Sequence, residues 1–475
     1  MVVALLAGCN DGGGARQDKA PPASAAPASV ATHKPASTII LRAANGGSHE
    51  IYAVDEHGAH ATRLSRPGTD TTYAGTLPGR RVVLAVHGAD HAVASLEVVA
   101  LDGSERRELG ALEPGRFARV VQAKADGEVL ALELGRAQDL GKSDVVVVRP
   151  GAAPALAAEN ATLVALAAGR VAFMTGGSLR STALDGSDAR TLGADDAEDR
   201  VVEVRGERLL LTIHAAVLGD VRVVKIDGSA RVDIGTPEAD DRPVGFAGDT
   251  RVVVTRAAGD ARAIEAVGVD GKDARTLAAG TVAAHAIAPT GDVVFSDGAG
   301  ALGTASAATT ASAAPRTLDP AAGTKVSAVK VLGERVFYLG GEGGSTLRTA
   351  RLDGSGATTL CAEPTWRPFF ATVTPDGRAI FYRALVGQLE GGRLYSVKLD
   401  GTGLEPLGND VVSPDGSAFT TPLSDQDFEA VTVNGRIVFE AEFHEGAPHL
   451  LVTDGGKRAL RLLDRDDLRF VALVE

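Results

Sequence analysis

Short apolar runs alternate with polar turns along almost the whole chain. Residues 96–109, LEVVALDGSERREL, show the pattern: an alternating apolar run, an Asp-Gly turn, and a second short run that contains leucine. Alternation with a period of two predicts half-buried β-strands, and Asp-Gly favours the tight turn that joins antiparallel strands. The pattern therefore predicts an all-β protein assembled from hairpins.

The same pattern returns at a nearly constant spacing. Further copies occupy residues 51–64, 145–156, 179–192, 221–234, 264–277, 347–360, 394–407 and 449–463, with a weaker copy at 301–318. A second turn lies upstream of most copies, as in Pro375-Asp376-Gly377, and is followed by another apolar run. Four short strands in roughly 42 residues is the repeat of a β-propeller blade, so the fold class is an all-β propeller.

Two of these segments also carry a family resemblance. Residues 366–382, WRPFFATVTPDGRAIFY, and 394–407, LYSVKLDGTGLEPL, resemble the repeat of TolB-like propellers, a WD-repeat-like architecture. The resemblance covers residues 38–475 and implies about ten four-stranded repeats, arranged either as one large ring of about 7–10 blades or as two rings. This motif supports many functions, so it predicts the fold more strongly than an activity.

The two ends of the repeat region complement each other. Residues 38–64 supply only the later strands of a first blade, and residues 467–475, DLRFVALVE, form one alternating strand with no turn after it. We expect these two segments to complete one blade together, because pairing them closes the ring and removes exposed strand edges. An insertion at 409–427 interrupts the repeat, so the number of blades is hardest to count in this region.

The first residues resemble the signal of bacterial lipoproteins. The sequence LLAGC ends at Cys9, as a lipobox does, and residues 10–37 are rich in Ala, Pro, Gly and Ser. We therefore expect three parts: a signal remnant at 1–9 with lipidation of Cys9, a disordered tether at 10–37, and a propeller at 38–475. Only eight residues precede Cys9 and none is basic, so we expect the true start to lie upstream of Met1.

Composition excludes several classes of protein. The net charge of −13 opposes binding to nucleic acid, which needs a basic face to neutralise phosphates. No run of about 18 apolar residues is present, so we expect attachment to a membrane through a lipid anchor only. The second cysteine, Cys361, has no motif around it, and we expect it to be buried and inert.

Motifs for common catalytic chemistry are missing from the sequence. It contains no G-x-S-x-G elbow, no phosphate-binding loop and no C-x-x-C pair. The aspartates of the repeated turns are oxygen ligands that suit calcium, but each turn offers only one or two acids. We therefore assign these aspartates to turn formation, and we expect no cofactor other than a divalent metal at the histidines described next.

Five histidines form the candidate metal site. His49, His87, His91, His444 and His449 fall between the second and third strands of the first, second and last repeats. Ring closure makes these three blades neighbours, and the loops emerge on one face. Carboxylates lie beside them in sequence, at Glu50, Asp90, Glu442 and Glu445. Imidazole and carboxylate groups suit zinc or another divalent ion, although loop histidines are more often solvated residues without a ligand.

These observations favour one function and leave two others open, one of which is a purely structural surface protein with no specific ligand. The first is a lipid-anchored propeller of the bacterial cell envelope, periplasmic or associated with the outer membrane. It would act as a monomeric, non-catalytic module that binds or scaffolds an envelope protein. The resemblance implies such a role, since TolB-like propellers engage peptidoglycan-associated proteins. The alternative is a metal-dependent hydrolase or lyase with its site on the face that carries the histidine loops.

Overall fold

The computed structural model describes residues 37–474, apart from gaps at 59, 194–197, 215–218, 237, 260, 281, 309–313, 321–325, 342–343, 363–365, 386–392, 409, 413–417, 420–422, 433, 444–448, 455–457 and 463–467. The predicted signal remnant with Cys9 and the predicted tether up to residue 36 lie outside the described residues. Among those that are described, no helix is long and apolar enough to cross a membrane.

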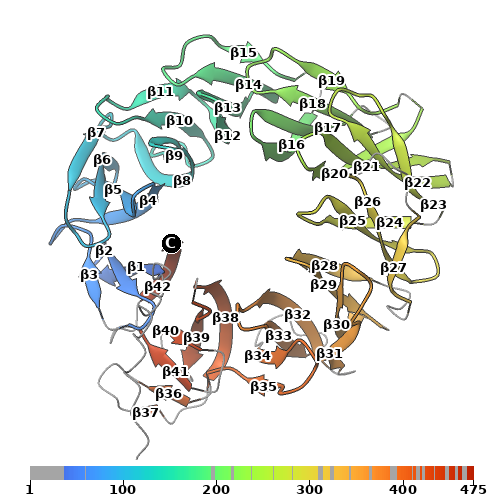
Figure 1. Ribbon diagram of the computed structural model, residues 1–475. Coiled ribbons are helices and arrows are strands. Elements are labelled where there is room, and N and C mark those ends of the chain that lie inside the picture. The colour runs from blue at the N-terminus through green and yellow to red at the C-terminus, as the bar shows by residue number, and fades with distance from the viewer. Residues whose placement is uncertain are drawn as a thin grey trace, which may run out of the picture. The chain divides into compact units, whose positions relative to one another are not determined.

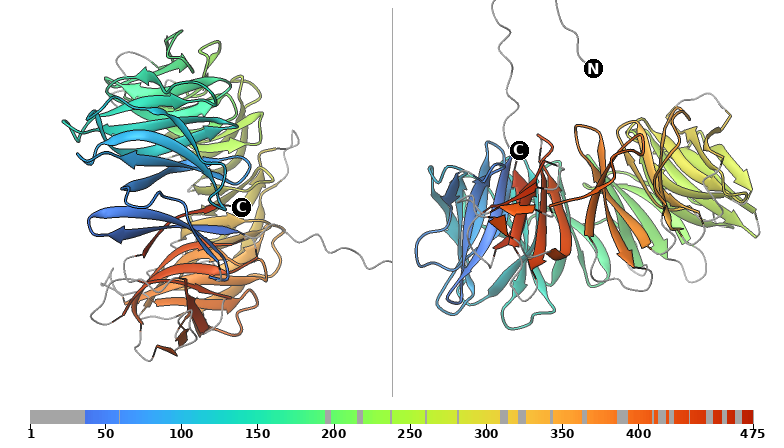
Figure 2. Two further views of the ribbon diagram at one scale, coloured as in Figure 1. Left: turned by 90° about the vertical axis from the view of Figure 1, so that its left-hand side faces the viewer. Right: turned by 90° about the horizontal axis from the view of Figure 1, so that it is seen from below.

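The described strands form ten sheets that follow one another around a ring, all antiparallel except for one parallel strand pair in the tenth (Figure 1). Nine sheets have four strands and one has six. Side views show the strands running along the axis of the ring, from one face to the other (Figure 2). The protein is therefore a single ten-bladed β-propeller, which confirms the predicted fold class and selects one ring over two.

Each blade has an innermost strand next to the ring axis, two middle strands and an outermost strand, in that order. The first blade consists of β42 (Leu468–Val474), β1 (Thr38–Asn45), β2 (Ser48–Asp55) and β3 (Ala61–Arg63). The second consists of β4 (Thr71–Leu77), β5 (Arg81–His87), β6 (Val93–Ala100) and β7 (Arg107–Ala111). The third consists of β8 (Phe117–Asp126), β9 (Val129–Arg136), β10 (Ser143–Val148) and β11 (Ala155–Ala158). The fourth consists of β12 (Ala161–Ala167), β13 (Arg170–Thr175), β14 (Ser178–Ala183) and β15 (Arg190–Thr191). The fifth consists of β16 (Glu198–Arg205), β17 (Arg208–His214), β18 (Gly219–Lys225) and β19 (Arg231–Asp233).

The remaining blades follow the same order. The sixth consists of β20 (Asp240–Ala247), β21 (Arg251–Ala258), β22 (Ala261–Gly268) and β23 (Arg275–Gly280). The seventh consists of β24 (Val282–Ile287), β25 (Asp292–Asp297), β26 (Leu302–Ser306) and β27 (Arg316–Asp319). The eighth consists of β28 (Ser327–Leu332), β29 (Arg335–Gly340), β30 (Thr346–Arg351) and β31 (Thr358–Ala362). The ninth consists of β32 (Trp366–Val373), β33 (Arg378–Leu385), β34 (Arg393–Lys398) and β35 (Glu405–Pro406). The tenth consists of β38 (Leu423–Val431), β39 (Ile437–Phe443), β40 (His449–Thr453) and β41 (Arg458–Arg461), extended at its outer edge by β36 (Asp410–Val412) and β37 (Ala418–Phe419).

The ring closes within the first blade. The last strand, β42, pairs antiparallel with the first, β1, from Thr38↔Val474 to Ala43↔Leu468. This confirms that the two ends of the repeat region complete one blade. The insertion at 409–427 does not form a blade of its own: β36 pairs parallel with β41 and carries β37 outside it. The weaker copy at 301–318 contributes to the seventh blade, which completes the count of ten.

Packing between blades explains the composition of the strands. Each of ten apolar clusters combines buried residues from two neighbouring blades, and together the clusters run around the whole ring. Ile40 and Ile51 of the first blade, for example, pack with Val82 and Leu84 of the second. Since a blade is covered on both faces, its middle strands are continuous apolar runs rather than alternating ones.

The repeated Asp-Gly turns fix the spacing between blades. Gly401 has a φ of +83°, and a Cβ at this position would lie 2.7 Å from the backbone oxygen of Thr359 in the preceding blade. Gly186 has a φ of +82°, and its Cβ would lie 2.8 Å from the oxygen of Leu156. These two turns therefore require glycine both for the backbone conformation and for close contact with the neighbouring blade.

Candidate functional site

Three of the five predicted histidines come together where the first blade meets the second. His49 lies near the start of β2, His87 ends β5, and His91 lies in the turn between β5 and β6. The two blades share a buried apolar cluster, which holds these elements side by side. His91 has a φ of +59°, a left-handed conformation, so this turn has a defined shape.

An aspartate that we did not predict lies at the centre of this cluster. Asp70 belongs to the connection between β3 and β4, and its Oδ1 accepts hydrogen bonds from the backbone N–H of His49 at 2.8 Å and from His49 Nδ1 at 3.0 Å. Its Oδ2 lies 3.6 Å from Nδ1 of His91. We call Asp70, His49, His87 and His91 the histidine cluster.

The ring of His87 is held at both nitrogens. Nδ1 lies 2.9 Å from the backbone oxygen of His91, and Nε2 lies 3.0 Å from Oγ1 of Thr72. A carbonyl oxygen can only accept, so Nδ1 carries a proton, and in the neutral ring Nε2 accepts from the threonine hydroxyl. His87 therefore links three backbone segments of the second blade.

Two opposing effects act on the Asp70 carboxyl. Partial burial raises its pKa, while the hydrogen bonds from His49 and the nearby charges of His87 and His49 lower it. The lowering effects prevail, and the pKa of Asp70 lies below its usual value. The carboxylate is therefore ionised at neutral pH and suited to hold the surrounding imidazoles in place.

The other predicted members of the metal site lie elsewhere. Glu50 accepts from the Tyr52 hydroxyl at 2.6 Å and pairs with Arg63 at 2.7 Å. Asp90 accepts the backbone N–H of Ala92 at 3.1 Å, which stabilises its own turn.

The remaining predicted residues of the metal site belong to the tenth blade. His449 is buried in β40, opposite Ala441 of β39. His444 and Glu445 lie outside the described residues, as does the side chain of Glu442. In the part of the chain that the structure describes, no three His, Cys, Asp or Glu side chains are grouped so as to hold a metal ion. The five-histidine metal site stays a prediction.

The aspartates of the repeated turns form the turns themselves, as predicted. Oδ1 of Asp353 accepts from the backbone N–H of Ser355 at 2.8 Å and from its hydroxyl at 2.6 Å. Asp400 makes the same two bonds with Thr402, at 2.8 and 2.7 Å. These hydroxyl and backbone donors lower the pKa of both carboxyls. Cys361, as predicted, is buried, between the eighth and ninth blades.

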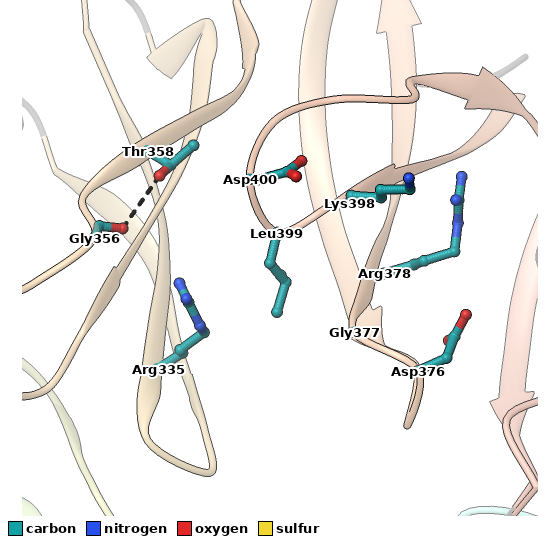
Figure 3. Close-up of a pocket in the computed structure, with 9 residues that line it drawn as sticks. All are labelled: Arg335, Gly356, Thr358, Asp376, Gly377, Arg378, Lys398, Leu399 and Asp400. Atoms are coloured by element: carbon teal, nitrogen blue, oxygen red, sulfur yellow. Dashed lines mark hydrogen bonds between the residues drawn. The ribbon is translucent and has the colours of Figure 1, made fainter.

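A cleft of about 490 Å³ lies between the eighth and ninth blades, on the face opposite the histidine cluster. It opens between the turns that follow the first and third strands of these blades. Its polar lining comes from Arg335 on one side and from Asp376, Arg378, Lys398 and Asp400 on the other (Figure 3). We call it the 8–9 cleft. No motif in the sequence pointed to it.

The innermost strands form a third candidate surface, the inner wall of the ring. Each of these ten strands has a shift in register against the second strand of its blade, which marks a β-bulge. A groove of about 310 Å³ runs between β4 and β8 beside Tyr73 and Val121. A second, of about 390 Å³, lies beside Arg205 and Val244.

Several bulges are fixed by a side chain from the preceding blade. Glu133 accepts from the backbone N–H of Leu163 at 2.9 Å. In the sixth blade the residue before the bulge is Pro243, which has no N–H, and Glu203 instead accepts from Phe246 N–H at 2.8 Å. These bonds connect innermost strands to the preceding blade at the bulges.

Comparisons with known proteins do not place the chain in a family. No protein-family model matches the chain, and no curated protein matches its sequence. Among solved structures it is similar to the tricorn protease, with 12% identity over 91% of this chain and 48% of that chain and a TM-score of 0.30. It is also similar to a puromycin hydrolase (16% identity, 76% of this chain and 56% of that chain, TM-score 0.35). A third is TolB from Acinetobacter baumannii (11% identity, 50% of this chain and 61% of that chain, TM-score 0.26).

The chain thus spans about half the length of the first two proteins. Similarities at these identities and TM-scores carry no functional argument. The strands of the structure establish the ten-bladed propeller by themselves. The function has to be argued from surfaces.

Proposed function

We propose that this protein is a non-catalytic, protein-binding module of the bacterial cell envelope, anchored by a lipid on Cys9, and that its inner wall binds an extended segment of a partner protein. One observation carries the proposal: most of the large apolar side chains that are exposed in the described part of the chain lie on innermost strands, beside open strand edges. An open edge with apolar side chains beside it suits the addition of an extended segment from a partner.

The exposed apolar residues are few and unevenly placed. Seven large apolar side chains are exposed in the described part of the chain, and four of them lie on innermost strands. These are Val121 on β8, Val202 and Val204 on β16, and Leu332 on β28. Val121 and Val202 are also the extra residues of their bulges, and they are 45% and 43% exposed. The bulges therefore contribute to their exposure.

The backbone of the inner wall favours an extended polypeptide as the ligand. Each innermost strand is the last strand of its sheet, so one of its edges has no neighbouring strand. Such an edge presents backbone N–H and C=O groups that another extended chain can pair with. Apolar side chains beside these groups would receive alternate side chains of the bound segment.

The proposed anchor rests on the sequence features around Cys9. Replacing Cys9 with Ser removes the thiol that would be lipidated. We expect the wild-type chain, expressed from a complete signal sequence, to fractionate with membranes and the Cys9→Ser variant to be released. If both fractionate with membranes, the lipid anchor is wrong, whereas the inner wall is tested separately.

The inner wall is tested by cross-linking from matched positions. A photo-reactive residue is placed at Val121, at Val202, or at Leu140, which is 69% exposed in the loop between β9 and β10. We expect one envelope protein to be captured from both inner positions and not from Leu140. We further expect Val202→Asp to abolish co-purification of that protein, because a carboxylate is costly to bury in an apolar contact. Leu140→Asp should leave it unchanged.

Two outcomes would overturn the inner wall as the binding surface. One is capture of the same protein from Leu140 as from the inner positions. The other is undiminished co-purification with the Val202→Asp variant while that variant remains folded by thermal denaturation.

A further inference from the structure

The 8–9 cleft differs from the other blade junctions in one residue. In six blades the first residue of the second strand is arginine: Arg81, Arg170, Arg208, Arg251, Arg335 and Arg378. Five of these have partners within the protein. Arg251, for example, donates to the backbone oxygen of Asp273 at 3.1 Å. The sixth, Arg335, lines the cleft, and its buried Nη1 has no hydrogen-bond partner among the described residues.

An unpartnered guanidinium nitrogen removed from water is costly, so Arg335 has hydrogen-bonding capacity that the described residues do not satisfy. Figure 3 shows Arg335 on the eighth-blade side of the cleft, below Gly356 and Thr358, with Leu399 of the ninth blade opposite it. The neighbouring Arg378, in contrast, is already engaged. Its Nη2 donates to Ser396 Oγ at 2.6 Å and to Glu405 Oε1 at 2.7 Å. Arg378 is therefore a fixed wall of the cleft, whereas Arg335 is available to bind an anion, as is Lys398 of the ninth blade.

The ninth blade adds groups of both signs. Lys398 contributes a cation, and its charge lowers the pKa of Asp400 after the larger effect of the Thr402 hydrogen bonds. Asp376 accepts the hydroxyl of Thr374 with its Oδ1, and Asp400 accepts from Thr402 with its own Oδ1. In the described part of the chain, Oδ2 of both aspartates makes no hydrogen bond. The cleft thus offers the Arg335 cation on the eighth-blade side, and two carboxylate oxygens beside the Lys398 cation on the ninth-blade side.

We propose that the 8–9 cleft binds a ligand of amino-acid or peptide type, with its carboxylate on Arg335 and its ammonium or amide N–H groups on Asp376 and Asp400. A guanidinium group matches a planar carboxylate with two parallel hydrogen bonds. A phosphate dianion fits less well, because both aspartates would repel its second charge. A volume of about 490 Å³ is within the range of small-ligand pockets.

The test uses three tripeptides that differ only at their ends. Trialanine carries both charges, N-acetyl-trialanine keeps the carboxylate alone, and trialanine amide keeps the ammonium alone. Binding to the purified full chain is measured by saturation-transfer NMR and calorimetry, at ligand concentrations up to about 10 mM. We expect trialanine to bind most tightly, and each single-ended peptide to bind about tenfold more weakly. Free alanine is the fourth ligand and distinguishes an amino-acid site from a peptide site.

Matched variants locate the binding. Arg335→Gln should weaken trialanine binding by about tenfold or more and leave binding of the amide unchanged. Arg251→Gln alters the same repeat position in the sixth blade and should have no effect on either ligand. The proposal is overturned if trialanine does not bind, or if Arg335→Gln and Arg251→Gln bind it equally. It is also overturned if the amide and trialanine bind with the same affinity. Inner-wall cross-linking is a separate measurement, so failure here does not bear on the proposed function.

Discussion

The histidine cluster and the 8–9 cleft lie on opposite faces of the same ring, and both combine turns of two neighbouring blades. In the histidine cluster, the Asp70 carboxylate holds His49, and both nitrogens of His87 are within hydrogen-bond distance of partners. In the cleft, Arg335 keeps a buried nitrogen without a partner among the described residues. Residue types that suit a ligand therefore do not identify a site by themselves. A group left without a partner is the stronger indication.

The largest expected effect comes from opening the ring. Deleting β42 removes Leu468 and Val474 from the core and exposes the edge of β1. We expect the free energy of unfolding to fall by more than about 4 kcal/mol. Hydrogen exchange should accelerate in the first two blades, which carry the histidine cluster, more than in the eighth and ninth.

A uniform increase in exchange across all ten blades would contradict this prediction. It would mean that the ring unfolds as one cooperative unit, and that the two regions do not differ in local stability.

Removing the central carboxylate of the histidine cluster should have the next largest effect. Asp70→Ala removes two hydrogen bonds to His49, and it also removes the negative charge that lies 3.6 Å from Nδ1 of His91. We expect a loss of about 2 kcal/mol in the free energy of unfolding, measured by urea denaturation. The control is Asp90→Ala, which removes one bond to the backbone N–H of Ala92 and should cost under about 1 kcal/mol. Equal losses would show that Asp70 does not organise the cluster.

The lowered pKa of the Asp70 carboxyl makes the stability of the protein depend on pH. Because the pKa of Asp70 is lowered in the folded protein, its contribution to stability is present above the unfolded value of 3.8 and is lost as the pH falls through the folded pKa. The wild-type protein should thus exceed Asp70→Asn in stability near neutral pH, and this difference should shrink on acidification below 3.8. Unfolding free energies of both proteins across that range test this. A difference that grows on acidification would contradict the assignment.

The smallest effect is expected in the cleft. Arg378→Gln removes bonds to Ser396 and Glu405 and should cost about 1 kcal/mol. Arg335→Gln removes a guanidinium whose Nη1 has no partner among the described residues, and it should change stability by under about 0.5 kcal/mol in either direction. Both are measured by thermal denaturation without ligand. If Arg335→Gln is the more destabilising of the two, Arg335 has a structural role and is not held ready for a ligand.

Most of the fold could be predicted from the sequence because the repeats are local patterns. An Asp-Gly turn between two alternating runs is readable within about 14 residues. The closing strand 467–475 was also predictable, since an unpaired strand at each end requires a partner. The insertion at 409–427 was harder to interpret, because β36 pairs in parallel with β41, which lies far along the chain.

The sites were less predictable because they depend on partners outside the motif. Asp70 lies in a connection between blades, about 20 residues from His49, with no pattern to link the two. Arg335 and Arg208 both follow Gly-Glu in the sequence. They differ in that Arg208 donates a hydrogen bond to the backbone oxygen of Asp249 in the next blade. The exposure of Val121 and Val202 depends on bulges, which shift one residue out of register without changing the apolar pattern.

Closure by β42 also has a consequence for biosynthesis. The first blade is incomplete until β42 has been made, so the order of synthesis cannot be the order in which the ring is completed. Among the described strand pairs this one has the greatest separation in sequence, and the entropy of closing so long a loop favours its late formation. A chain that stops early keeps an open edge on β1, which makes it prone to aggregation and proteolysis. Ring closure is thereby a built-in check that only chains containing β42 pass.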